Sequence, residues 1–130
     1  MAISGLYTMT KFLLLCAIYY QAICHGFDPQ LVTAMVAVES SFRPAARCGQ
    51  SVGLLQVNVP IWRDELKLDP SRMTEIQYNL NAGLDILCIY IRQTGDVWRA
   101  IHFYNNGPSG KYNSNYVQKV KAAYKKLYGR

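Results

Sequence analysis

Residues 39–58, which read ESSFRPAARCGQSVGLLQVN, decide how this chain folds and carry its most informative side chains. The acid that opens the stretch, Glu39, follows Val32 by seven residues and Met35 by four, so the three share one stripe of a helix. A carboxylate on the buried stripe of a helix is costly unless it has a partner or a function. Burial also raises the pKa of a carboxylic acid, which suits a general acid that works near neutral pH.

Three short motifs follow one another along the chain: Glu-Ser at 39–40, Gly-Leu-Leu-Gln at 53–56 and Tyr-Asn-Asn-Gly at 104–107. In this order they resemble the soluble lytic transglycosylase family of peptidoglycan-cleaving enzymes, which is related to goose-type lysozyme. That family carries Glu-Ser, Gly-Leu-Met-Gln and Tyr-Asn-x-Gly motifs. The resemblance covers about residues 27–124, and the one departure within the motifs is Leu55, where the family often has Met.

The resemblance implies an all-α, lysozyme-like single domain with a substrate groove. It also implies a carbon-oxygen lyase that cuts the β-1,4 bond between N-acetylmuramic acid and N-acetylglucosamine. Glu39 would first protonate the leaving oxygen as general acid, and then act as base toward the muramic acid 6-hydroxyl, which gives a 1,6-anhydro product. Most glycosidases use two carboxylates, whereas this family works with one.

The same resemblance assigns substrate-binding roles to side chains of the three motifs. The amides would bind N-acetyl or hydroxyl groups of the sugar, and the tyrosine would form a wall of the site or hydrogen-bond to Glu39. A structural role as a helix cap remains equally open for the serine. These candidate substrate-binding residues are Ser40, Leu55, Gln56, Tyr104 and Asn105. We expect Asn79 and Gly83 to be structural, with the glycine allowing close helix packing.

Two other functions remain open from the sequence. One is a true hydrolase of the same bond, a lysozyme, whose product would be one water heavier. The other is a wall-binding assembly protein of a secretion, conjugation or phage system. The expected partner in all three cases is the peptidoglycan glycan strand, and components of a secretion, conjugation or pilus machine are further candidate partners. The chain is expected to be a monomer, and no cofactor or metal is expected.

The 130 residues are enough for one domain with its own core, and the patterns are mostly helical. Asp28 and Pro29 are typical of a helix start, as N-cap and first helical residue. Further helices are predicted over about 60–66, 74–94, 97–104 and 115–127, and residues 44–53 are predicted to be loop. Asp69-Pro70 repeats the cap-then-proline signal.

Residues 1–24 resemble a signal peptide, with Lys11 ahead of an apolar run at 12–18 and small residues before a cut after Cys24. This predicts export to the periplasm or cell envelope and a catalytic domain over 25–130. The alternative is an uncleaved amino-terminal anchor. After such a cut Cys48 and Cys88 would remain, either as a disulfide or as two free thiols.

The net charge of +6 is unevenly distributed, because residues 111–130 contain six Lys and Arg and no acid. This basic segment is either a solvated helix face or a surface attracted to the anionic cell wall or membrane. No nucleic-acid motif accompanies the charge, so nucleic acid is not an expected partner. On the last helix Val117, Val120, Tyr124 and Leu127 are predicted to face inward.

Overall fold

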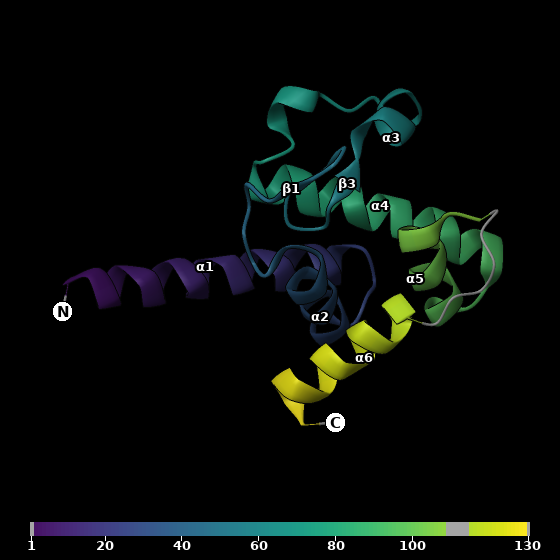
Figure 1. The fold of residues 1–130 in the computed structure, drawn as a ribbon. Helices are drawn as coiled ribbons and strands as arrows, with labels where there is room; N and C mark the ends of the chain where they lie inside the picture. The colour runs from purple at the N-terminus through teal and green to yellow at the C-terminus, as the bar shows by residue number, and fades with distance from the viewer. Residues whose placement is uncertain (1, 109–114, 130) are drawn as a thin grey trace.

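The computed structural model describes residues 2–108 and 115–129, which form helices, a 3-10 turn and three very short strands (Figure 1). The helices confirm the all-α class predicted from the sequence. The elements are α1 (Ala2–Cys24), α2 (Pro29–Ser40), β1 (Arg47–Cys48), β2 (Ser51–Val52), β3 (Val57–Asn58), α3 (Val59–Leu66), η1 (Pro70–Arg72), α4 (Ile76–Thr94), α5 (Val97–Asn106) and α6 (Asn115–Tyr128).

Helix α2 begins where the sequence predicts. The side chain of Asp28 accepts a hydrogen bond of 2.9 Å from the backbone N–H of Gln30, and Pro29 occupies the first turn. An N-cap of this kind satisfies a backbone donor that has no partner inside the helix. Asn58 and Asp96 cap α3 and α5 in the same way, so short polar side chains define three of the helix starts.

The end of α2 is unusual and it determines where Glu39 lies. Ser41 and Phe42 both have left-handed backbones, with φ of 51° and 62°. Two successive non-glycine residues in this region are strained. The chain therefore stops its helix directly after Ser40 and turns sharply, which leaves Glu39 on the last turn of α2 with its side chain free to face a groove.

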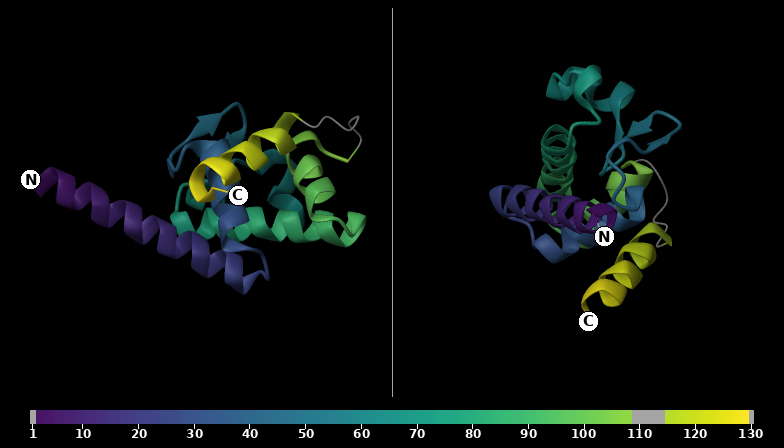
Figure 2. Two further views of the ribbon diagram at one scale, coloured as in Figure 1. Left: turned by 90° about the horizontal axis from the view of Figure 1, so that it is seen from below. Right: turned by 90° about the vertical axis from the view of Figure 1, so that its left-hand side faces the viewer.

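Helix α1 belongs to the core at its carboxyl-terminal half and projects from the body at its other end (Figures 1 and 2). It contacts α2 and α4. Ile18 and Ala22 are completely buried, and Leu14 and Ala17 nearly so. The sequence predicts a domain that begins at residue 25, yet these side chains are part of the same hydrophobic cluster as those of α2 and α4. None of the helices, over the residues that the structure describes, is both long and apolar enough to cross a membrane.

Helix α4 runs through the centre of the molecule and has an apolar stripe along one side. Leu80, Leu84 and Leu87 are fully buried, while Ile76 and Ile91 at the two ends are partly buried. The helix begins at Ile76, two residues later than the pattern predicts. Helices α1 and α5 pack against α4, and α6 packs against α2.

Helix α6 departs from the predicted pattern at its last turn. Val117 and Val120 are buried as predicted, but the side chain of Leu127 is 44% exposed. Tyr124 and Tyr128 form a tilted ring pair with centroids 5.6 Å apart, and the Tyr128 hydroxyl lies 3.3 Å from that of Tyr19 on α1. The two tyrosines occupy the inward side of the turn, so the prediction that Leu127 faces inward is wrong.

Residues 47–58, largely predicted as loop, form a three-stranded antiparallel sheet. Arg47 pairs with Val52, and Ser51 pairs with Asn58. Each strand has only two residues, too few for the alternating pattern by which strands are predicted. The turn between the first two strands uses Gly49 at φ 59°.

A buried amide fastens this small sheet and the following loop to α4. Asn79 accepts a hydrogen bond of 2.8 Å from the Leu55 N–H and donates to the carbonyls of Val52 and Met73 at 2.8 and 2.9 Å. Its side chain is 1% exposed. One asparagine thus satisfies three buried backbone groups, which agrees with the structural role predicted for it.

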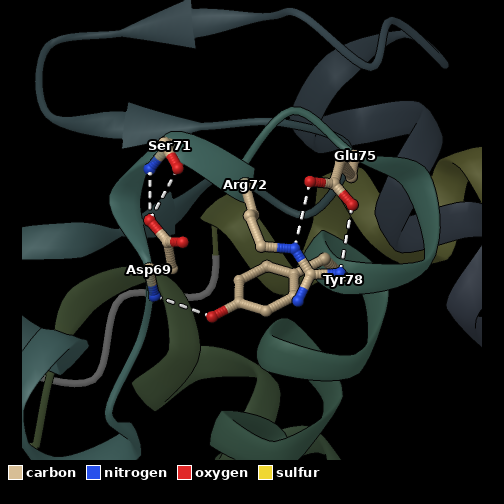
Figure 3. A network of polar contacts seen from close by, with 5 residues as sticks. All are labelled: Asp69, Ser71, Arg72, Glu75 and Tyr78. Carbon is tan, nitrogen blue, oxygen red and sulfur yellow. Dashed lines mark hydrogen bonds and ion pairs between the residues drawn. The ribbon is translucent and has the colours of Figure 1, made fainter.

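A polar network holds the connection from α3 to α4 (Figure 3). Asp69 accepts from the backbone and hydroxyl of Ser71 at 3.0 and 2.7 Å, while its own N–H donates to the Tyr78 hydroxyl at 2.7 Å. Arg72 donates twice to Glu75 and lies over the Tyr78 ring at 4.3 Å. Asp69 and Pro70, the predicted cap and proline, start a 3-10 turn here rather than an α-helix.

Candidate active site

A groove of about 370 Å³ lies between the end of α2, the small sheet, α3, α4 and α5. Its walls combine aromatic rings with amide and carboxyl side chains. Trp62, Tyr90 and Phe103 form a chain of edge-to-face rings, with centroids 5.7 and 5.8 Å apart. The described lining residues are Glu39, Cys48, Ser51, Gln56, Val57, Asn58, Ile61, Trp62, Ile86, Tyr90, Phe103, Tyr104, Asn105, Asn106 and Gly107.

Glu39 is the acid of this groove. Burial raises the pKa of its carboxyl from 4.5 to about 7, although a hydrogen bond from Tyr116 acts in the opposite direction. A carboxyl group with this pKa is half protonated near neutral pH, so it can donate a proton in one step and accept one in the next. This matches the expectation from the position of Glu39 on the apolar stripe.

Tyr116, on α6, is a site residue that the sequence did not predict. Its hydroxyl donates a hydrogen bond of 2.8 Å to Oε2 of Glu39 across 77 residues of chain. Its side chain is 6% exposed, and burial, followed by the neighbouring Glu39, raises the pKa of the phenol well above 10. Tyr116 therefore keeps its proton and remains a hydrogen-bond donor to Glu39 throughout the neutral range.

Tyr104 walls the groove but does not bond to Glu39. Its hydroxyl donates to the carbonyl of Leu55 at 2.6 Å, and burial is the main reason why its pKa is well above 10. Gly83 makes room for this contact, because a Cβ there would lie 2.7 Å from Cβ of Leu55 and 2.9 Å from the Tyr104 hydroxyl. The close-packing role predicted for Gly83 thus has a direct structural basis.

Gln56 lines the groove as predicted, but much of its amide is already used. Its Nε2 donates to the carbonyls of Ala46 and Gly53 at 3.1 and 3.0 Å, and its backbone is left-handed with φ 48°. The side-chain nitrogen therefore holds the loop in shape. The oxygen is the part of this amide whose hydrogen-bonding capacity those two bonds leave unused.

Ser40 and Leu55 are not in the groove. The Ser40 hydroxyl donates to the carbonyl of Val36 at 3.0 Å within α2, and its side chain is 2% exposed. Leu55 is fully buried behind the groove wall. Both side chains lie in the core while their motif neighbours Glu39 and Gln56 line the groove, so their predicted contact with substrate finds no support in this geometry.

Asn105 and Asn106 lie at the open side of the groove and are exposed. Asn106 contacts Nδ1 of His102 at 3.3 Å, and His102 itself is completely buried. His102 is thus a packed core histidine and does not line the groove. Asn105, predicted to bind sugar, is in the position to do so.

Among the described lining residues Glu39 is the only carboxylate, and residues 109–114 contain no acid in the sequence. Glycosidases that use two carboxylates hold them about 5–9.5 Å apart across the scissile bond. The described part of the chain also has no group of three or more His, Cys, Asp or Glu that could hold a metal ion. Acid–base chemistry in this groove therefore depends on one carboxyl group.

Cys48 and Cys88 are both free thiols in the structure, which is the second of the two arrangements that the sequence left open. Cys48 is exposed on β1 and lines the same groove as Glu39. Cys88 is partly buried on α4 and lines a different pocket. An even number of cysteines outside the first 24 residues does not reveal that the two thiols lie in different pockets.

A family model described as Transglycosylase SLT domain matches residues 18–127, most of the chain. No curated protein and no solved structure matches this chain. The fold and the groove with its single acid are those of a small lysozyme-like domain, and the chain belongs to the SLT transglycosylase family, whose members act on peptidoglycan. The match begins within α1, at the same residue, Ile18, where complete burial begins.

Proposed function

We propose that this chain is a lytic transglycosylase that cuts the bond between N-acetylmuramic acid and N-acetylglucosamine and leaves a 1,6-anhydromuramic acid end. The observation that carries the proposal is Glu39, a single carboxyl with a pKa of about 7 in a groove whose other described lining residues include no acid. The family match supports the substrate class.

In the proposed first step the protonated Glu39 gives its proton to the glycosidic oxygen as the bond to C1 of muramic acid breaks. The hydrogen bond from Tyr116 then favours the carboxylate that results. In the second step the carboxylate takes the proton of the 6-hydroxyl on the same sugar. The 6-oxygen bonds to C1 and closes the anhydro ring, so Glu39 ends as it began and no water is consumed.

A lysozyme-type hydrolase is the closest alternative, because water could attack C1 in place of the 6-hydroxyl. A general base for that water would have to be Glu39 itself, since no second acid faces the groove within the described residues. A catalytically idle wall-binding protein is less well supported, because burial of an acid with a raised pKa has a stability cost that binding alone does not require.

The products of a digest distinguish these functions. Purified peptidoglycan incubated with the full chain should release muropeptides that are one water lighter than those of a lysozyme digest. Products of full mass would show hydrolysis. The absence of products, together with retained binding to sacculi, would indicate an assembly protein.

We further propose that the chain works in the cell envelope, where its substrate is, and that it opens the wall for a secretion, conjugation or phage system. The substrate class supports the location. We propose that it acts as a monomer.

A further inference from the structure

A second pocket, of about 950 Å³, lies at the opposite end of α2 from Glu39. It is an open concavity bordered by the turn between α1 and α2, by α4, by the start of α5 and by α6. No part of the proposed mechanism uses it. Most of its wall is apolar, formed by Phe27, Leu31, Cys88, Ile91, Val97 and Trp98.

The cations and the acids of this pocket differ in how far they are already paired. Arg92, Lys121 and Lys125 line it and are exposed, and within the described residues none of them forms a salt bridge. Lys121 lies 4.8 Å from the centre of the Trp98 ring. Three cations thus border an apolar wall.

The acids nearby are already engaged. The two carboxylate oxygens of Asp28 accept from the Gln30 N–H at 2.9 Å and from the Tyr124 hydroxyl at 3.3 Å. Asp85 lies 3.0 Å from Nε2 of His25. A ligand in the pocket would therefore meet three cations that form no salt bridge within the described residues, and one lining carboxylate, Asp28, that already accepts two hydrogen bonds.

From this charge pattern we propose that the pocket binds a single-chain anionic amphiphile, an acyl or similar chain with a carboxylate or phosphate head. The chain would lie against Trp98 and Ile91, and the head would be bound by Arg92 and Lys125. A mostly apolar concavity of this volume with a few convergent polar groups is typical of a small-ligand site, whereas a protein partner generally requires a broader surface. The proposal is independent of the function proposed for Glu39.

The chain offers a direct probe of this pocket. It has two tryptophans, Trp62 in the catalytic groove and Trp98 in the second pocket. In a Trp62→Phe background, tryptophan emission, excited selectively over that of the tyrosines, comes from Trp98 alone. Titration with dodecanoate and with dodecyl phosphate, both below their micelle concentrations, should change this emission saturably. Dodecylammonium, with the same chain and a cationic head, should bind at least about tenfold more weakly, since like charges repel.

Matched variants separate local recognition from net charge. Arg92→Gln with Lys125→Gln should weaken dodecanoate binding by about tenfold or more, as expected when two charge-assisted contacts are lost. Lys119→Gln with Lys126→Gln removes the same charge from exposed positions that do not line the pocket, and should leave binding unchanged. Lys121 is kept in both, because it contacts the reporter ring.

Three results would overturn the proposal. The first is equal affinity for the anionic and cationic amphiphiles. The second is equal loss of affinity in the two double variants. The third is no saturable change with either anionic probe, which would leave the pocket to a protein segment. If dodecyl phosphate alone binds, the proposal stands and the head is a phosphate; if dodecanoate alone binds, it stands and the head is a carboxylate.

Discussion

The hydroxyl of Tyr116 donates a 2.8 Å hydrogen bond to Oε2 of Glu39, and so connects the last helix to the last turn of α2. Burial raises the pKa of this acid to about 7, and the tyrosine holds it below the value that burial alone would set. The pair is thus balanced, since one effect favours the protonated carboxyl that gives up a proton and the other favours the carboxylate that follows.

The first prediction concerns Tyr116→Phe, which removes the hydroxyl and keeps the ring. The pKa of Glu39 should rise, by about one unit or more for a lost hydrogen bond to a charged group. The alkaline limb of the pH–activity profile should move to higher pH, while kcat falls. Tyr128→Phe is the control, because its hydroxyl pairs with Tyr19 far from the groove. An unmoved limb would show that Tyr116 is only a packing residue.

The second prediction concerns Glu39→Gln. The amide is nearly the same shape but cannot protonate the leaving oxygen. A general acid–base group contributes about 10²–10⁴ in rate, and Glu39 has both roles, so the loss should be at the upper end or beyond. Release of muropeptides from sacculi measures it. A variant that keeps more than a tenth of the parent activity would contradict the mechanism.

The third prediction concerns stability and pH. The pKa of Glu39 is about 7 in the folded chain, whereas a glutamate in an unfolded chain has the ordinary value of 4.5. Between these two pH values the folded state therefore binds more protons than the unfolded state. Its contribution to stability is therefore greatest below pH 4.5 and decreases as pH rises to 7, by about 3 kcal/mol in all. Glu39→Gln should abolish this part of the slope and be the more stable protein at pH 8. Parallel denaturation curves of the two chains at every pH would refute it.

The sequence was informative where the determinants are local. Asp28 and Pro29 define the start of α2, and the position of Glu39 on its stripe indicated a buried acid. Tyr116 could not be found in this way, because a tyrosine beside Val117 on an inward helix face looks like core, and its contact with Glu39 arises only when α6 packs on α2.

The other differences have similar causes. Ser40 and Leu55 belong to motifs that reach the groove. Within each motif some side chains line the groove and others lie in the core, and the motif sequence alone does not show which side chain does which. The short strands depend on Asn79 and its bonds to Val52 and Leu55, which join segments more than twenty residues apart. The burial of Ile18 and Ala22 was likewise not predicted, because an apolar run after a single lysine is typical of an export signal and also of a helix that packs in the core.

The fourth prediction concerns Cys48, which is exposed in the groove. In a background with Cys16→Ser and Cys24→Ser, a bulky maleimide should modify Cys48 first, because burial raises the pKa of Cys88 and only the thiolate reacts. Modification should block digestion of sacculi. Cys48→Ser with Cys88 intact is the control and should retain activity after the same treatment. Slow modification of Cys48, or full activity afterwards, would contradict the placement of this thiol in the groove.

The last prediction concerns α1 and tests whether the catalytic domain can begin at residue 25. Ile18 and Ala22 are completely buried against α2 and α4, so a chain lacking residues 1–24 should lose far more stability than a single core truncation. Ile18→Ala alone should cost about 2–5 kcal/mol, and Leu13→Ser, at a side chain that is 58% exposed, should stay within about 0.5 kcal/mol. Urea denaturation of the three variants against the parent measures the order. If the chain from residue 25 onward unfolds at the same urea concentration as the parent, α1 is dispensable and cleavage after Cys24 is compatible with a stable enzyme. If it is strongly destabilised, the second half of α1 must remain in the mature protein, and any processing must occur before Leu14.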